Sequence, residues 1–304
     1  MTISNLTQRF AGKEVRDYER GQPVDSAADV VYRLSLDYDA DTTMVTLLDE
    51  FLAEVDKSRL EALVIGAWEE PHENNPDGVI AALADRAADL PQLKAVFIGD
   101  ITYEECEISW IIQGDYTRLL QAFPRLEQLH IRGSNSLTFP ACTHAGLKRL
   151  VIECGGLPAT VWQGLAGCSF PALEHLELWV GTSDYGFDAD LDAVTAAVEK
   201  LRTPGLRYLG LRDAEMADAI AAWIAGQPWI SQLAVLDLSL GTLGDEGAQA
   251  LLNSPLVRRL PRVDLSHHYI SDELQAQLRA AMPGVVLDDV QEEDDEYRYV
   301  AVGE

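Results

Sequence analysis

Histidine, cysteine and carboxylate side chains are the groups in this sequence that could bind a metal ion or catalyse a reaction. The histidines in or directly after predicted strands are His130, His175, His267 and His268. His267 and His268 are adjacent, so their side chains should point to opposite sides of the chain. His130 and His175 lie two strands apart, too far for one ion at about 4.8 Å per strand. Because a zinc site needs three or four convergent ligands, we expect no metal and no other cofactor.

The motifs of common enzymes are also missing. The sequence has no serine nucleophile elbow, no glycine-rich phosphate loop and no HExxH segment. Cys154 follows a predicted strand and could act as a nucleophile, but we interpret it as a structural cysteine. We therefore expect a protein without enzymatic activity. One alternative stays open, an enzyme that acts on a small substrate through His175, Glu177 and Asp237.

Polar and aromatic side chains alternate with the aliphatic residues of the predicted strands. Alternate residues of a strand face opposite sides, so these side chains should form ladders on one open, concave face of a sheet. The candidates for binding a protein partner there are Glu177, Trp179, Tyr208, Arg212, Asp237, Asp264, His130, Arg132, Glu153 and His175. Trp, Tyr and Arg dominate the binding energy of many interfaces. The pattern predicts a recognition surface.

Two carboxylates of this set should be direct neighbours. Asp237 and Asp264 occupy equivalent positions of adjacent strands, where like charges repel unless a cation lies beside them. Arg212 and Arg262 could supply that cation from within the protein. Alternatively, the carboxylates could await a basic group of a ligand. The sequence leaves both interpretations open.

Two acidic segments are expected at the rim of the concave face. Residues 68–71 read Trp-Glu-Glu-Pro, and residues 100–110 contain Tyr103, Glu104, Glu105, Glu107 and Trp110. The second segment could be an N-capped, acidic helix start with Trp110 in the core. It could also be an acidic, aromatic insertion that contacts a basic partner, because loops often carry function.

The elements that position these residues follow a repeated pattern. Leu233, Leu236, Leu238 and Leu243 form the frame LxxLxLxxxxL, which returns with first positions at 31, 60, 93, 126, 147, 173, 206, 233 and 260. The first copy is expected to use Val31, Leu34 and Leu36. The copies separated by 33 residues should carry longer helices or loop insertions. Helices are expected at residues 44–55, 79–90, 191–201, 217–224, 246–252 and 272–282, with Asp245 as a cap and an extended connection at residues 133–144.

The frame, together with the segment Leu-Gly-Asp-Glu-Gly-Ala at residues 243–248, resembles leucine-rich repeat proteins of the ribonuclease-inhibitor-like class. The resemblance implies a right-handed α/β solenoid over residues 31–287, shaped as a horseshoe with a parallel concave sheet and outer helices. Residues 99–110 and 297–304 also resemble a bacterial family of uncharacterised leucine-rich repeat proteins, which implies no activity.

The two ends of the chain fall outside the frame. Residues 1–30 are expected to be an N-terminal cap that covers the first layer of the core. Residues 288–304 form an acidic tail, which is expected to be a solvated terminus. Alternatively, Tyr297, Tyr299, Val300 and Val302 could form a short strand that docks on the last edge of the sheet.

Composition limits the partners. The chain has 304 residues, 23 basic against 50 acidic, and a formal net charge of −27. Such a surface repels phosphate backbones and anionic lipids, so we expect neither nucleic-acid nor membrane binding. No apolar run has the length of a membrane span and no signal-peptide pattern is present, so a cytoplasmic location with four reduced cysteines is expected. The expected function is recognition of a basic protein partner, and a structural role in a bacterial assembly is a further alternative.

Overall fold

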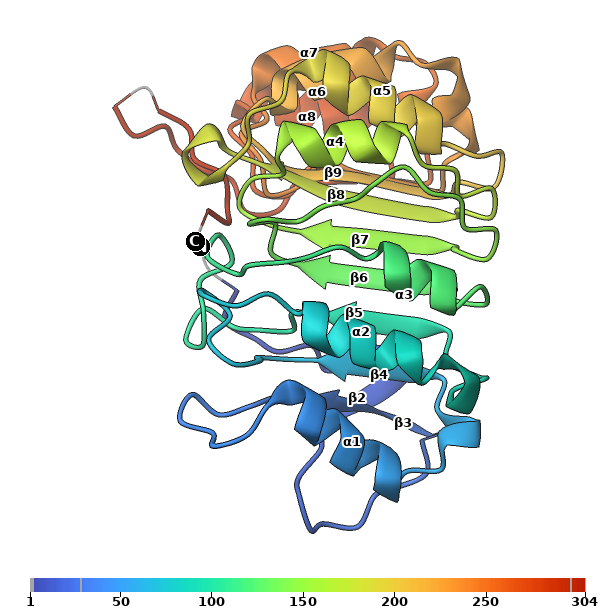
Figure 1. The fold of residues 1–304 in the computed structure, drawn as a ribbon. Coiled ribbons are helices and arrows are strands. Elements are labelled where there is room, and N and C mark those ends of the chain that lie inside the picture. Colours follow the sequence, from blue (N-terminus) through green and yellow to red (C-terminus); the bar gives the residue numbers. More distant parts are fainter. Residues whose placement is uncertain (1–2, 28, 296, 304) are drawn as a thin grey trace.

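The computed structural model describes residues 3–27, 29–295 and 297–303, in which twelve strands form one open sheet (Figure 1). The strands lie side by side in the order of the sequence, and every neighbouring pair is parallel except the antiparallel pair β1–β2. They are β1 (Arg9–Phe10), β2 (Lys13–Asp17), β3 (Val30–Leu34), β4 (Ala62–Ile65), β5 (Ala95–Ile98), β6 (Gln128–Arg132), β7 (Arg149–Glu153), β8 (His175–Gly181), β9 (Tyr208–Ala214), β10 (Val235–Asp237), β11 (Arg262–Asp264) and β12 (Val285–Val286). The expected α/β class with a parallel sheet is confirmed. Residues 1, 2, 28, 296 and 304 of the expected cap and tail lie outside the described residues.

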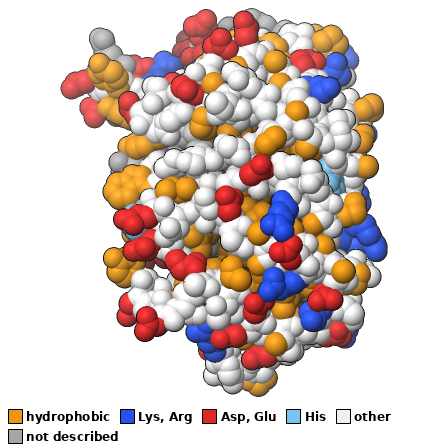
Figure 2. All heavy atoms as spheres, in the orientation of Figure 1, with side chains coloured by type: hydrophobic (Ala, Val, Ile, Leu, Met, Phe, Trp, Pro, Cys, Tyr) orange, Lys and Arg blue, Asp and Glu red, His pale blue; other side chains and the backbone are white. Residues whose placement is uncertain are grey.

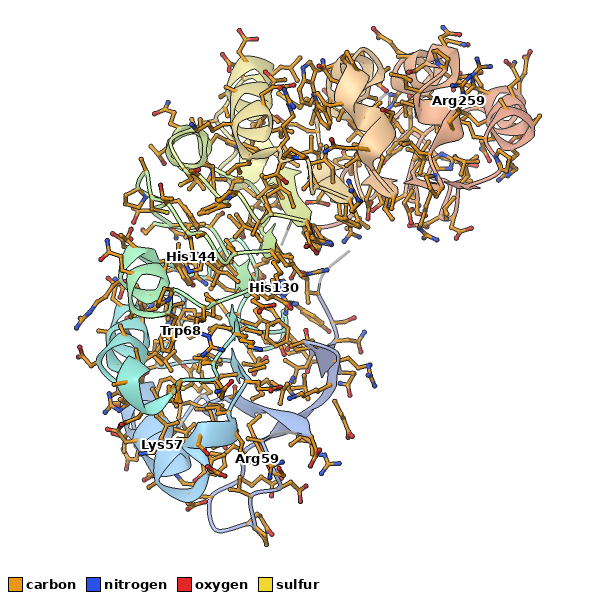
Figure 3. All side chains as sticks on the ribbon, turned by 90° about the vertical axis from the view of Figure 1, so that its right-hand side faces the viewer. Lys57, Arg59, Trp68, His130, His144 and Arg259 are labelled. Carbon is orange, nitrogen blue, oxygen red and sulfur yellow. The ribbon has the colours of Figure 1, made fainter. Side chains whose placement is uncertain are left out.

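The α-helices of the described chain all cover one face of the sheet (Figure 1). They are α1 (Met44–Glu54), α2 (Asp77–Asp85), α3 (Thr117–Ala122), α4 (Ala159–Ala166), α5 (Leu191–Leu201), α6 (Ala217–Ala225), α7 (Asp245–Asn253) and α8 (Asp272–Ala281). The layers follow an arc with the helices outside and the strands inside (Figure 3). None of the described helices is long and apolar enough to cross a membrane.

The leucine frame builds the core between the sheet and the helices. One column of side chains pairs in register across eight strands and is at most 1% exposed: Leu63, Val96, Leu129, Leu150, Leu176, Leu209, Leu236 and Val263. A second column two residues later, including Ile131 and Leu211, is buried with it. The spacing of two places both columns on one face, as the frame predicts. Burial of this continuous core is the main stabilising contribution to the fold.

The predicted register of the first copy is wrong. Tyr32 and Leu34, not Leu34 and Leu36, pair with the core residues Leu63 and Ile65 of β4. Tyr32 points into the core against Phe51 of α1, with the ring centroids 5.4 Å apart. In this copy a tyrosine occupies the core position that is aliphatic in the copies around it. The true frame therefore begins two residues earlier than predicted. Arg33 of β3 is therefore the neighbour of Val64 of β4.

Several helices match the prediction and two were missed. α1 and α5 start at capped positions, with the side chains of Thr43 and Asp190 accepting backbone N–H bonds. α3 and α4 were not predicted, whereas residues 133–144 contain no helix, as expected. Asp245 does not cap α7; instead Asp218 of the neighbouring α6 accepts from the amides of Gly244 and Gly247 at 2.9 and 3.0 Å. The 33-residue spacings after β4 and β5 are taken up by long loops where these strands end.

The N-terminal hairpin covers part of the inner face. β1 and β2 turn through Ala11 and Gly12, both with positive φ, as hairpin turns require. Phe10 then lies over Phe97 of β5 and His130 of β6, with centroids 5.9 and 6.5 Å apart. A second apolar cluster results, containing Phe10, Val15, Val31, Ala62, Val64, Ala95 and Phe97. The expectation of an open concave face is therefore wrong at β3, β4 and β5, where the hairpin covers it.

The C-terminal segment lies over the loops where the strands end, on the left in Figure 1, rather than beside β12. The Ala301 amide donates to the Leu240 carbonyl at 2.7 Å, and the Val302 amide donates to Asp213 at 2.9 Å. The Tyr299 carbonyl lies 3.2 Å from His267 Nε2. These contacts connect the segment to the ends of β9, β10 and β11.

Candidate partner-binding surfaces

Glu177 lies at the centre of the exposed part of the inner face. Its carboxylate accepts from Arg212 Nη1 at 2.8 Å, from Trp179 Nε1 at 3.2 Å and from His175 Nε2 at 3.3 Å. The side chain is 7% exposed. Burial alone would raise the pKa of this carboxyl, but the His175 hydrogen bond and the Arg212 charge outweigh burial and hold the pKa well below its usual range. Glu177 is therefore a fixed anion.

Arg212 joins Glu177 of β8 to Asp237 of β10. Its Nε lies 2.9 Å from Ser239 Oγ and 3.5 Å from Asp237 Oδ2. The guanidinium also lies over the Trp179 ring, 5.3 Å from the centroid. One cation thus neutralises two carboxylates that are both largely buried. The Tyr208 hydroxyl completes the environment of Asp237 by donating to Oδ2 at 2.7 Å.

His175 is held as a neutral ring in the same network. Its ring stacks on Tyr208 with centroids 3.8 Å apart, and its Nδ1 lies 3.0 Å from Arg149 Nη1. Burial lowers the pKa of His175. A neutral ring with the proton on Nε2 can accept from Arg149 and donate to Glu177. We name Arg149, His175, Glu177, Tyr208, Arg212 and Asp237 the central cluster.

Asp264 forms a separate pair. It stands in register with Asp237, but it accepts from Arg262 Nη2 at 2.6 Å and from Ser266 Oγ at 2.7 Å. Asp237 has its own partners, Arg212 and Tyr208. Both carboxylates are thus compensated within the chain, as the first of the two interpretations expects.

His130, Arg132 and Glu153 form a second network, which Val151 separates from Glu177 along the ladder. Arg132 Nε donates to Glu153 at 2.7 Å, and its Nη1 lies 3.3 Å from the fully buried Asp100. Arg33 binds the other oxygen of Asp100 at 2.9 Å. His130, labelled on the inner side of the arc in Figure 3, lies 3.0 Å from Glu153 Oε1 and stacks on Phe97 at 3.7 Å. The sequence analysis identified neither Arg33 nor Asp100. Asp100 lies in the loop after β5, and Arg33 lies on β3, whose register was predicted wrongly.

Acid titration should reveal the second network. Burial would raise the pKa of Glu153, but Arg132 and His130 lower it from 4.5 to about 2. A depressed pKa contributes stability above pH 4.5 that is lost as the pH falls toward 2. We expect Glu153→Gln to reduce the acid-induced loss in unfolding free energy by on the order of 3 kcal/mol, measured by urea unfolding between pH 5 and 2. Glu246→Gln, at an exposed carboxylate, should leave the acid dependence unchanged. Parallel wild-type and Glu153→Gln curves would contradict the assignment.

The chemistry available to these networks is limited. The Glu177 carboxyl is held ionised, so it is not available as a proton donor near neutral pH. Burial raises the pKa of Cys154 to about 12, so its thiol is a poor nucleophile at neutral pH. Across residues 3–27, 29–295 and 297–303, no group of three or more His, Cys, Asp or Glu side chains is placed to hold a metal ion.

The two acidic rim segments meet at a cavity of about 510 Å³ where β3, β4 and β5 end. Residues 100–110 form turns without a helix, and Trp110 is 58% exposed, so the expectation of a helix start with a core tryptophan is wrong. The lining residues are Leu36, Asp37, Tyr38, Asp39, Ala40, Ala67, Trp68, Glu69, Glu70, Pro71, His72, Glu104 and Glu105. We name this cavity the rim pocket. Acidic side chains gather along this left-hand edge in Figure 2.

The charges of the rim pocket differ from those of the inner face. Six carboxylates line it, and within the described chain none of them forms an ion pair with lysine or arginine. The floor is apolar and includes Leu36, Ala67 and the buried ring of Trp68, whose Nε1 donates to the Asn74 carbonyl at 2.8 Å. The sequence pointed to Trp68, Glu69 and Glu70 but not to Asp37, because the neighbouring Leu36 was expected to lie within the first strand. The misassigned first register explains that error.

Comparison with known proteins gives a relationship without a described activity. The sequence matches no protein-family model and no curated protein at a significant level. Among solved structures, the chain is similar to a Bacteroides fragilis protein determined by the Northeast Structural Genomics Consortium, with a TM-score of 0.80 and 30% identity. The match covers 89% of this chain and 76% of that chain. The chain therefore belongs to the same family as this Bacteroides fragilis protein.

Proposed function

We propose that the chain is a right-handed leucine-rich repeat solenoid that acts as a non-catalytic scaffold for binding a protein partner. The repeat assignment is supported by strands that follow one another in sequence order and share one column of buried Leu, Ile and Val side chains. Parallel strands joined by helical crossovers are right-handed in about 98% of cases. Each layer needs its neighbours to bury its apolar side, which is the physical basis of a solenoid.

The proposed partner presents a basic segment, and its contact is the rim pocket. One observation carries the proposal: six carboxylates surround an apolar floor with no lysine or arginine paired to them within the described chain. The carboxylates of the central cluster, in contrast, already have arginine partners. A basic group would therefore gain more at the pocket than on the inner face.

Lysine and arginine side chains fit the pocket by shape as well as charge. Their aliphatic stems can cover apolar surface while the charged ends reach a polar rim. Trp68 and Leu36 supply that apolar surface, and Tyr38, which is 93% exposed, stands at the edge. Glu70 has a φ of 45°, a conformation that non-glycine residues seldom adopt and that clusters at functional sites. The surrounding loop thus holds the backbone of Glu70 in a defined conformation.

Binding of a labelled peptide of alternating lysine and leucine, followed by fluorescence anisotropy, tests the proposal. We expect the Glu70→Gln, Glu104→Gln double variant to bind about tenfold more weakly, because two ionic contacts of up to ~1 kcal/mol each are lost. The matched control is Asp192→Asn, Glu273→Gln, which removes the same charge at exposed sites on α5 and α8. It should bind as the wild type does. Equal weakening in both variants, or none in either, would overturn the pocket assignment.

A further inference from the structure

Two cysteines from neighbouring layers face each other at the middle of the arc. Cys142 lies in the helix-free connection between β6 and β7, and Cys168 follows α4. Their Sγ atoms are 3.7 Å apart. The flanking residues Thr143 and Ser169 form a parallel bridge, and the Ser169 amide donates to the Cys142 carbonyl at 2.8 Å.

The backbone at this point is compatible with a disulfide. Neighbouring parallel segments lie about 4.8 Å apart. A disulfide usually spans Cα atoms that are about 4.4–6.8 Å apart. The sulfur atoms already point at one another, so a bond requires the side chains to close by less than about 2 Å. The bridge at Thr143 and Ser169 holds both segments in this position.

The pair is also chemically distinct from the other two cysteines. The Cys142 thiol can donate to the Cys168 sulfur, and this hydrogen bond lowers the pKa of Cys168 to about 7. Burial instead raises the pKa of Cys106 to about 11 and that of Cys154 to about 12. Cys142 is partly exposed, which gives a small reagent access to the pair.

We propose that Cys142 and Cys168 form a reversible disulfide when the protein meets a low-molecular-weight disulfide. Cys142 passes its thiol proton to the Cys168 thiolate, and the Cys142 sulfur attacks one sulfur of the reagent. This step forms a mixed disulfide and releases one small thiolate, which takes the proton from Cys168. The Cys168 thiolate then attacks Cys142 Sγ and expels the second small thiolate. Overall, two protein thiols are oxidised to one disulfide, and one small disulfide is reduced to two small thiols, which carry away both protons.

The bond would brace the helix-free connection between β6 and β7. Cys142 lies on that connection, and the loop closed by the bond contains β7 and α4. Cross-linking removes freedom from the unfolded chain, so the oxidised protein should melt at a higher temperature. The site is separate from the rim pocket, and the inference does not depend on partner binding.

Incubation with oxidised glutathione, followed by alkylation with iodoacetamide in denaturant and intact-mass analysis, tests the proposal. We expect the wild type to change from four alkylated cysteines to two, and dithiothreitol to restore four. Peptide mapping should link Cys142 to Cys168, and the oxidised protein should have a raised Tm that the reductant reverses.

The variants separate this pair from other thiol chemistry. Cys142→Ser and Cys168→Ser should each form no internal cross-link, while Cys106→Ser should form the same one as the wild type. Circular dichroism of the reduced variants controls for folding. Four alkylated cysteines after oxidation, or a cross-link that survives in Cys142→Ser, would overturn the assignment. Cross-linking without a change in Tm would overturn the bracing role.

Discussion

Replacing Arg212 with alanine is expected to lower the free energy of unfolding by about 3 kcal/mol, measured by urea denaturation at pH 7. The arginine neutralises Glu177 and Asp237, whose side chains are 7% and 11% exposed. Without it, Glu177 keeps only Trp179 and His175 close by, and Arg149 lies 3.8 Å away. A largely buried carboxylate that loses its nearest cation destabilises the protein by more than the original ion pair stabilised it.

A matched arginine provides the control for this prediction. Arg262 pairs with Asp264 two residues away on β11, and its side chain is 53% exposed. Arg262→Ala should therefore cost less than about 1 kcal/mol, because exposed ion pairs contribute little. The double variant Arg212→Ala, Glu177→Gln should recover part of the lost unfolding free energy, because it also removes the negative charge of Glu177. Equal effects of the two arginine substitutions would mean that Glu177 and Asp237 are hydrated rather than enclosed.

Truncation of Phe10 should have a comparable effect for a different reason. We expect Phe10→Ala to destabilise the protein by about 3–5 kcal/mol, the range for large-to-small changes in a core. The phenyl ring covers Phe97 and closes the second apolar cluster. Its loss should expose Val64 and Phe97, both 0% exposed in the intact protein, and increase the fluorescence of a dye that binds apolar surface. Thermal melting and dye titration measure the two effects.

Arg9 serves as the comparison residue on the same short strand. It is exposed and donates to the Gly12 carbonyl in the hairpin turn. Arg9→Ala should change stability by less than about 0.5 kcal/mol, because surface substitutions seldom do more. If Phe10→Ala were equally mild and left dye binding unchanged, the hairpin would not cover the inner face in solution.

The leucine frame allowed most of the fold to be predicted, because it depends on residues that are close together in the sequence. Two aliphatic residues two positions apart, such as Leu209 and Leu211, must share one face of a strand, and repetition of that pattern requires the strands to stack. The same rule failed at β3, where the core position holds Tyr32. A search for leucine-like residues therefore selected Leu36, which lies beyond the end of the strand.

The candidate sites were harder to predict, because pairing depends on neighbours that are distant in the sequence. The alternation of residues correctly placed Glu177 and Asp237 on one face of the sheet and Asp237 beside Asp264. It could not show that Arg212 neutralises both Glu177 and Asp237, because this depends on the direction of the arginine side chain. It also could not show that Asp37 and Glu104 line one cavity, because the lengths and paths of two loops set their separation. It likewise could not show that the Ser239 hydroxyl donates to Asp237 and accepts from Arg212.

The sequential order of the strands has an evolutionary consequence. Each strand pairs only with the strands that precede and follow it in the chain. A gene segment that encodes one strand, its helix and the return loop could be duplicated or deleted without rethreading the rest of the polypeptide. Lineages of such a protein can therefore change the length of the arc one module at a time while the surviving modules keep their geometry.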